Sequence, residues 1–178
     1  MYKNKIKFTF FVSLIALAFF NLVSAKGVYL EPEAFLSGIF DQATPEASRL
    51  LIKEELKKDI KQILGHRYKT FRIPYWQKDG RTVWILEEIG KELPITAGFV
   101  VADGKIEQFK VLIFRESRGW EVRNDFFTQQ FYGAHLLPKQ KLSHHIDNIT
   151  GATMSVDAMK KLSRMALYLH QHVTQQSK

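Results

Sequence analysis

Two Asp-Gly dipeptides, Asp79-Gly80 and Asp103-Gly104, constrain the fold of this chain more than any other local pattern. In a two-residue hairpin turn both central residues need positive φ, which Asp-Gly tolerates well. The flanking segments alternate in part between apolar and polar residues. The sequence therefore predicts two hairpins, residues 68–77 with 81–88 and residues 95–102 with 105–115. Together they predict an antiparallel sheet of about four strands.

Pro74 lies within the first of these predicted strands. A proline has no backbone N–H to donate to a sheet ladder, so prolines are found on edge strands or at bulges. We therefore expect the strand that contains Pro74 to be an edge strand or to carry a bulge.

Helical patterns lie on both sides of the predicted strands. Residues 26–43 read as a loose lead-in. Thr44 then suits an N-cap and Pro45 a first helical position, and the apolar stripe that follows ends at Gly65. This predicts a helix over residues 45–64. A short helix is expected from residue 124 or 125 to about residue 131, and a long one from Ser155 to about residue 173. Helix, hairpins and helices in this order are typical of an α+β fold.

The first 25 residues have the pattern of an export signal. Lys3, Lys5 and Lys7 precede an apolar run over residues 8–22, and Val23-Ser24-Ala25 offers the small residues that signal peptidase requires. The run is shorter than the roughly 20 residues that usually span a membrane. Cleavage after Ala25 is the preferred interpretation, and an uncleaved N-terminal anchor is the alternative. The chain is therefore expected to be exported, to the periplasm or the outer face of the cytoplasmic membrane.

Charge and cysteine content narrow the classes of function. Without residues 1–25 the chain keeps 23 Lys and Arg against 18 Asp and Glu. On an exported protein this mild excess suits an anionic membrane surface better than nucleic acid, so no nucleic-acid partner is expected. The sequence contains no cysteine, which rules out disulfides, thiolate metal sites and iron–sulfur clusters. Any redox chemistry must therefore come from a bound organic cofactor.

The segment before the C-terminal helix has the composition of a phosphate site. Gly151 and Ala152 are small enough for a ligand to approach the backbone, and Thr153 adds a hydroxyl. With Ser155 as N-cap, the free N–H groups of the first helical turn would favour a phosphate beside Thr153. A threonine hydroxyl needs a base or a metal to act as a nucleophile, and nothing in the chain clearly supplies one. Covalent attachment would therefore need a separate enzyme.

This segment resembles the attachment motif of the FMN-binding domain family, Asp-x-x-[Ser/Thr]-Gly-Ala-Thr. Each fixed position is present, at Asp147, Thr150, Gly151, Ala152 and Thr153. Members include the FMN subunits of the sodium-translocating NADH:quinone oxidoreductase and of Rnf-type complexes, as well as small exported proteins. The resemblance implies that Thr153 carries FMN through a phosphoester. It also implies that the preceding motif residues are recognised by an FAD:protein FMN transferase.

A second segment also resembles the family. Its members carry a strand that ends in Glu-Thr-Pro-Gly before a Phe-rich helix, and here the matching residues are Glu116, Ser117, Arg118 and Gly119. The resemblance implies that these four residues contribute to the FMN site. Ser-Arg replaces Thr-Pro, so backbone contacts from Gly119 are expected, while Arg118 could instead pair with a flavin phosphate or carbonyl. The resemblance covers about residues 95–169.

We therefore divide the chain into residues 1–25 as signal or anchor, residues 26–94 as an N-terminal helix and hairpin, and residues 95–173 as an FMN-binding domain. The expected function is electron transfer between a membrane-bound redox protein and extracytoplasmic partners. The alternative is an exported interaction or membrane-surface module without flavin.

Other candidate sites have weaker support in the sequence. No catalytic residue is assigned, since Ser143, His144 and Asp147 lack a nucleophile elbow. The histidine pairs lack a recognised metal-ligand spacing, so no metal site is assigned either. No single aromatic residue is assigned to the flavin ring. The candidates for that role are Tyr75, Trp76, Trp84 and Trp120.

Overall fold

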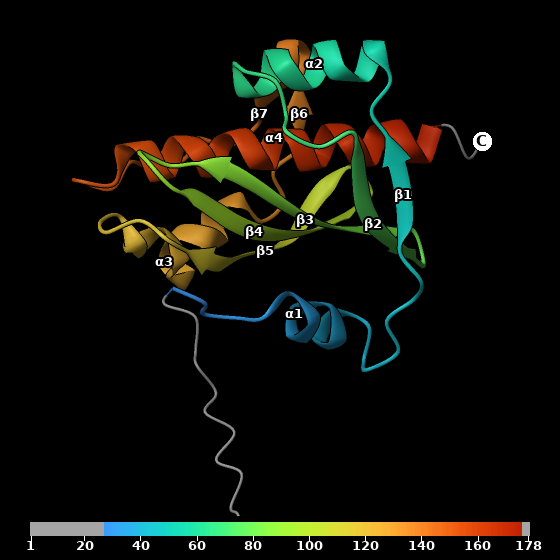
Figure 1. Cartoon of the computed structure of the whole chain (residues 1–178), viewed down its shortest axis with the longest axis horizontal. Coiled ribbons are helices and arrows are strands. Elements are labelled where there is room, and N and C mark those ends of the chain that lie inside the picture. The colour runs from blue at the N-terminus through green and yellow to red at the C-terminus, as the bar shows by residue number, and fades with distance from the viewer. Residues whose placement is uncertain (1–26, 176–178) are drawn as a thin grey trace, which may run out of the picture.

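A computed structural model describes residues 27–175, and its centre is a five-stranded antiparallel sheet in the order β1-β2-β3-β4-β5 (Figure 1). The export-signal prediction lies outside the described residues. The strands are β1 (Ser48–Leu51), β2 (Arg72–Lys78), β3 (Arg81–Ile89), β4 (Pro94–Ala102) and β5 (Lys105–Phe114). The predicted α+β class is confirmed, and the sheet has one strand more than expected.

Both predicted hairpins are confirmed. Asp79 and Gly80 have φ values of 50° and 76°, and Asp103 and Gly104 have values of 49° and 71°. Positive φ at both central positions is the requirement that the Asp-Gly dipeptides were expected to meet. The turns set the register, because the last residue of β2 pairs with the first of β3, and the last of β4 with the first of β5.

The additional strand, β1, occupies the first part of the helix predicted over residues 45–64, so that prediction was wrong there. Ser48 pairs with Tyr75 and Leu51 with Arg72. The helix α2 (Glu54–Leu64) begins only after this strand and ends at Gly65, which has φ 84°. The N-cap pattern at Thr44 was a local signal, and long-range pairing with β2 outweighed it.

Pro74 is also placed differently from the expectation of an edge strand. The strand β2 lies between β1 and β3, and Pro74 pairs with Arg49 of β1. Pairing between β2 and β3 begins one residue later, at Tyr75. Pro74 therefore has no paired residue in β3, and its missing N–H leaves no gap in the pairing between β2 and β3.

A long helix, α4 (Thr153–Gln175), lies across one face of the sheet, with α2 beside it (Figure 1). Arg164 of α4 donates to the carbonyl of Ile63 in α2 over 3.1 Å, and the Tyr168 hydroxyl donates to Asp59. The side of α4 that faces the sheet is buried and apolar, as the sequence predicted. Its buried residues include Val156, Met159, Leu162, Ala166 and Leu169.

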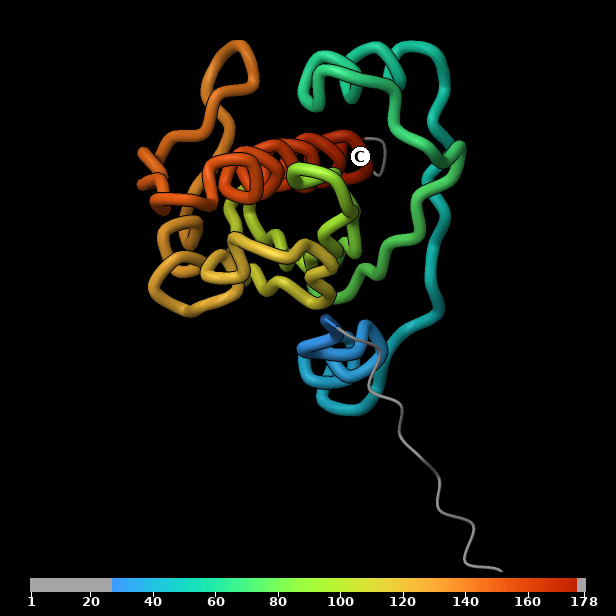
Figure 2. Tube along the Cα trace, turned by 60° about the vertical axis from the view of Figure 1, so that its left-hand side comes forward, coloured from blue at the N-terminus to red at the C-terminus, as the bar shows by residue number. Residues whose placement is uncertain are grey.

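The opposite face of the sheet is covered by α1 (Pro32–Ile39), which lies within the residues predicted as a loose lead-in. That prediction was wrong. Pro32 stands in the first turn of the helix, and Phe35 and Leu36 are buried against the sheet. A β-carbon on Gly98 of β4 would lie 2.5 Å from the Phe35 ring, so the glycine makes room for that ring. Figure 2 shows α1 and α4 on opposite sides of the sheet.

The chain between β5 and α4 consists of short elements. They are η1 (Trp120–Arg123), α3 (Asp125–Thr128), η2 (Gln129–Phe131), β6 (Leu136–Leu137), η3 (Pro138–Gln140) and β7 (Lys141–Leu142). The short helix predicted near residues 124–131 is confirmed as α3 followed by η2. Within residues 27–175, none of the helices combines the length and the apolar composition needed to cross a bilayer.

Candidate functional site

Thr153 is the first residue of α4, and its side chain is exposed. The helix begins two residues earlier than predicted, because the Val156 N–H donates to the Ala152 carbonyl over 2.9 Å. Ser155 is therefore not the N-cap. It lies in the first turn and is 4% exposed. The threonine hydroxyl is left at the open end of the helix.

The start of α4 has unpaired donors. Among the described residues, no acceptor faces the backbone N–H groups of Thr153, Met154 or Ser155. Such groups, together with the positive end of the helix dipole, form a ready site for an anion. A phosphate on or beside the Thr153 hydroxyl could accept hydrogen bonds from these backbone N–H groups.

The second predicted segment lies directly against the first. Gly119 has φ 82°, and a β-carbon there would lie 2.7 Å from Ser155 Oγ and 3.3 Å from the Ala152 β-carbon. The absence of a side chain at Gly119 therefore lets the chain after β5 touch the start of α4. Two segments that are more than thirty residues apart in the sequence therefore lie in direct contact.

A cleft of about 510 Å³ lies where the two segments meet. Arg118 and Lys91 bring positive charge to it. Arg118 is exposed and forms no ion pair with any described residue. The cleft is lined by Lys91, Glu92, Glu116, Ser117, Arg118 and residues 151–155. We refer to it as the cofactor cleft.

Glu116 holds one wall of the cofactor cleft. Its carboxylate accepts the N–H groups of Glu92 and Leu93 over 2.6 and 2.9 Å. Burial acts to raise the pKa of Glu116, but these N–H groups and the charge of Lys91 outweigh it and keep the pKa below its ordinary value. Glu116 therefore fixes the loop of residues 91–93. Sequence reasoning missed this loop, and no motif in the sequence marks it.

Gly119, a predicted site residue, is buried and is not among the residues that line the cofactor cleft. Asp147 and Thr150 also lie outside the cleft. Both are exposed in the segment that leads into α4. The Asp147 backbone N–H donates to Gln130 Oε1 over 2.8 Å, and its carboxylate lies 3.5 Å from His145 Nε2. Asp147 thus pairs with His145 rather than with His144. Ser143, His144 and Asp147 therefore do not form the relay of a hydrolase triad.

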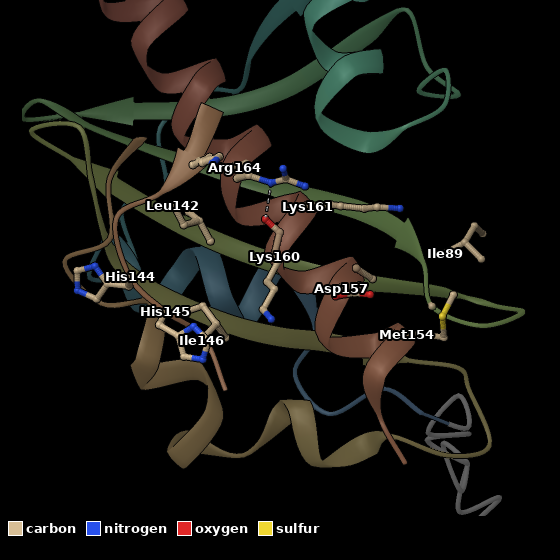
Figure 3. Close-up of a pocket in the computed structure, with 13 residues that line it drawn as sticks. Ile89, Leu142, His144, His145, Ile146, Met154, Asp157, Lys160, Lys161 and Arg164 are labelled. Atoms are coloured by element: carbon tan, nitrogen blue, oxygen red, sulfur yellow. Dashed lines mark hydrogen bonds between the residues drawn. The ribbon is translucent and has the colours of Figure 1, made fainter. Parts of the chain in front are cut away.

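A second, basic groove of about 440 Å³ borders the cofactor cleft at Met154 (Figure 3). In the close-up, Lys160 of α4 points toward the segment that carries His145 and Ile146, whereas Lys161 and Arg164 extend toward the opposite side of the groove. Two of these cations are already engaged, because Lys161 Nζ lies 3.7 Å from a carboxylate oxygen of Glu88 and Arg164 bonds to two carbonyls.

The aromatic candidates occupy different places. Tyr75 and Trp84 stack on each other at 4.9 Å, and Trp84 is fully buried. Trp76 packs against the cluster under α1. Trp120 follows Gly119 directly and is 44% exposed. Of the four, it is the one next to a cleft segment in the sequence.

Comparison with protein families agrees with this site. Residues 90–168 match the family model described as the FMN-binding domain. A search of curated proteins found no match. The matched range contains every predicted site residue and both segments of the cofactor cleft. Residues 90–168 therefore form a domain of the FMN-binding domain family, which supports a flavin-binding protein.

Proposed function

We propose that this protein is an exported flavoprotein that carries FMN as a phosphoester on Thr153 and transfers electrons between membrane-associated and extracytoplasmic partners. One observation carries the proposal. Within the matched FMN-binding domain, an exposed threonine hydroxyl stands at the start of α4, beside free N–H groups and the cofactor cleft.

The residues of the cleft suit a phosphate and the adjoining part of a flavin. Backbone N–H groups of the first turn of α4 would receive the phosphate, and Arg118 would balance its charge. Gly119 lets the segment that carries Arg118 pack against the start of α4, since a side chain at residue 119 would collide with Ser155. Glu116 also lines the cleft, but its carboxylate accepts the N–H groups of residues 92 and 93 and would not bind the phosphate.

Attachment would be catalysed by an FAD:protein FMN transferase. The Thr153 oxygen forms a bond to the FMN phosphorus, the phosphoanhydride bond of FAD breaks, and AMP leaves. The hydroxyl proton passes to a base on the transferase. Asp147 and Thr150 are exposed ahead of α4, where an enzyme that approaches Thr153 could also reach them.

The electron-transfer role rests on the cofactor and on the partners that the sequence allows. Bound FMN can take up and release one or two electrons, and the protein sets its position and surroundings. The chain has no cysteine for an iron–sulfur cluster and no nicotinamide-binding fingerprint. Its electrons would therefore come from another redox protein or a quinol. The export pattern of residues 1–25 supports an exchange outside the cytoplasm.

Mass spectrometry tests the attachment. Produced together with the transferase, the protein should gain the mass of FMN less one water on the peptide that contains Thr153. Thr153→Ala should abolish the gain. Ser155→Ala is the matched control, because it removes a buried hydroxyl from the same turn and should leave the gain intact.

Two other results would contradict parts of the proposal. A yellow protein that loses its colour on denaturation and desalting would mean non-covalent FMN. A colourless, unmodified protein under the same conditions would favour an exported interaction module without flavin. The mass of the protein isolated from its own host tests export, because cleavage would leave Lys26 as the first residue, whereas an intact N-terminus in a cytoplasmic fraction would contradict it.

A further inference from the structure

The start of the described chain is fastened beside the end of β5. The Phe114 N–H donates to the Gly27 carbonyl over 2.8 Å, and the Tyr29 N–H donates to the Leu112 carbonyl over 2.9 Å. Gly27 has φ 96°, and a β-carbon there would lie 2.0 Å from the Phe114 oxygen. The chain therefore enters the domain at one defined place, next to the strand that leads into the cofactor cleft.

This entry point restricts where the N-terminal sequence can lie. The apolar run of residues 8–22 ends five residues before Gly27. Five residues span at most about 18 Å even when fully extended. If the run is retained in a bilayer, Gly27 and the end of β5 must stay within that distance of it. If it is cleaved, Lys26 follows the cut and brings its side-chain charge and the new α-amino group to the same place.

Aromatic side chains are exposed around this entry point. Tyr29, Trp120 and Phe126 are 44%, 44% and 61% exposed, and they are three of the four large aromatic residues that are exposed within residues 27–175. The Arg123 guanidinium lies 3.8 Å from the centre of the Tyr29 ring and 4.9 Å from that of Trp120. Phe126 follows Asp125, which lines one groove together with Tyr29 and Arg123. We name Tyr29, Trp120, Arg123 and Phe126 the aromatic face.

The composition of the aromatic face suits the surface of a bilayer. Tyrosine and tryptophan concentrate at the boundary between headgroups and acyl chains. There the apolar ring can lie against the acyl chains while its polar atom stays in contact with water or headgroups. The Arg123 guanidinium, held against two rings, can bind a lipid phosphate from the same position. A shallow groove of about 450 Å³ beside Tyr29 and Arg123 also includes Lys110 and Asp125, which pair with each other over 2.5 Å, so Arg123 is the cation of this groove without an ion pair to a described residue.

We propose that the aromatic face is a docking surface for an anionic lipid bilayer. It would hold the domain in one orientation at the membrane, close to where the N-terminal sequence joins it. The face is close along the chain to the cofactor cleft, because Trp120 stands two residues after Arg118, which lines the cleft. The cleft would then open near the membrane surface. This inference rests on residues 27–126 and does not require that flavin be bound.

Site-directed labelling of the full chain tests the proposal without interference, because the sequence contains no cysteine. In Phe126→Cys a fluorophore is placed on the aromatic face. In the control, Phe71→Cys, the label stands just before β2 at a residue that is 73% exposed. The Phe71 carbonyl accepts the N–H of Ile52, which lies two residues before α2. Both proteins are reconstituted in vesicles of phosphatidylcholine and phosphatidylglycerol that contain a nitroxide-labelled lipid.

The label at residue 126 should be quenched at least about twofold more strongly than the label at residue 71, because it would rest among the headgroups. Adding Tyr29→Ser and Trp120→Ser to the Phe126→Cys protein should reduce that quenching, with the circular dichroism spectrum unchanged. Equal quenching at residues 71 and 126 would overturn the proposal. So would quenching that the two serine substitutions leave unchanged, since a tether alone would then explain it. Neither result depends on the labelling of Thr153 with FMN.

Discussion

Replacing Gly119 by alanine tests whether direct contact between two distant segments shapes the cofactor cleft. At φ 82° a side chain is disfavoured, which costs roughly 1–2 kcal/mol. The new β-carbon would also lie 2.7 Å from Ser155 Oγ, and Ser155 is buried and cannot simply move into solvent. Overpacking of this kind adds about 1–3 kcal/mol. We therefore expect Gly119→Ala to lower the free energy of unfolding by about 2–5 kcal/mol.

Gly151→Ala is the matched control. Gly151 has the same φ of 82°, but a β-carbon there would meet nothing within 4 Å. Only the backbone cost should remain, so urea unfolding should separate the two variants by about 1–3 kcal/mol. Adding Ser155→Ala to Gly119→Ala removes the nearest atom and should recover part of the loss. If the two glycine variants were equally destabilised, the contact between Gly119 and the first turn of α4 would not exist as described.

Three further predictions concern stability. Glu116→Gln should cost about 1 kcal/mol. The pKa of Glu116 is lower in the folded protein than in the unfolded chain, so its carboxylate stabilises the fold above the unfolded pKa. This stabilisation is lost as pH falls through the folded pKa. In urea titrations at several pH values, the free energy of unfolding of Glu116→Gln should therefore fall less with acid than that of the unchanged protein. Burial lowers the pKa of His170, although the charge of Asp103 acts to raise it, and the neutral ring accepts the Gly104 N–H at Nε2. The protein should therefore lose stability as pH falls below about 6.5, where the unfolded chain binds a proton on His170 more readily than the folded one. His170→Gln should lose less stability over the same pH range. Gly98→Ala should cost about 1–3 kcal/mol, because the Phe35 ring leaves no room for a methyl group; an unchanged urea midpoint would show that α1 is not seated there.

The parts of the fold that were predictable are those fixed by local chemistry. Asp79-Gly80 and Asp103-Gly104 set their hairpins because the requirement for positive φ lies within the two residues themselves. The strand β1 was not predictable in this way, because Ser48 pairs with Tyr75 and nothing nearby announces that partner. Thr44 and Pro45 even favour a helix there. The helix α1 is only eight residues long, and its stability comes from the sheet face that it covers.

The candidate site divides in the same manner. Thr153 and Gly119 were each assigned from the sequence through motifs that resemble a known family. Their contact through Ser155 is a tertiary feature that no spacing in the sequence predicts. The loop that begins at Lys91 was missed, because it reaches the cleft only through the bonds that its backbone gives to Glu116.

Because helices cover both faces of the sheet, the FMN-binding domain cannot be moved into another protein as the matched residues alone. The family match begins at residue 90, yet β1, β2, β3, α1 and α2 all precede that residue. A gene fragment trimmed to the match would leave β4 without its neighbour β3 and would remove α1 from one face of the sheet, so that a strand edge and apolar side chains are exposed, which invites aggregation. The smallest fragment that should keep the fold of the cleft therefore starts near residue 27, so that α1 and strands β1 to β3 are included.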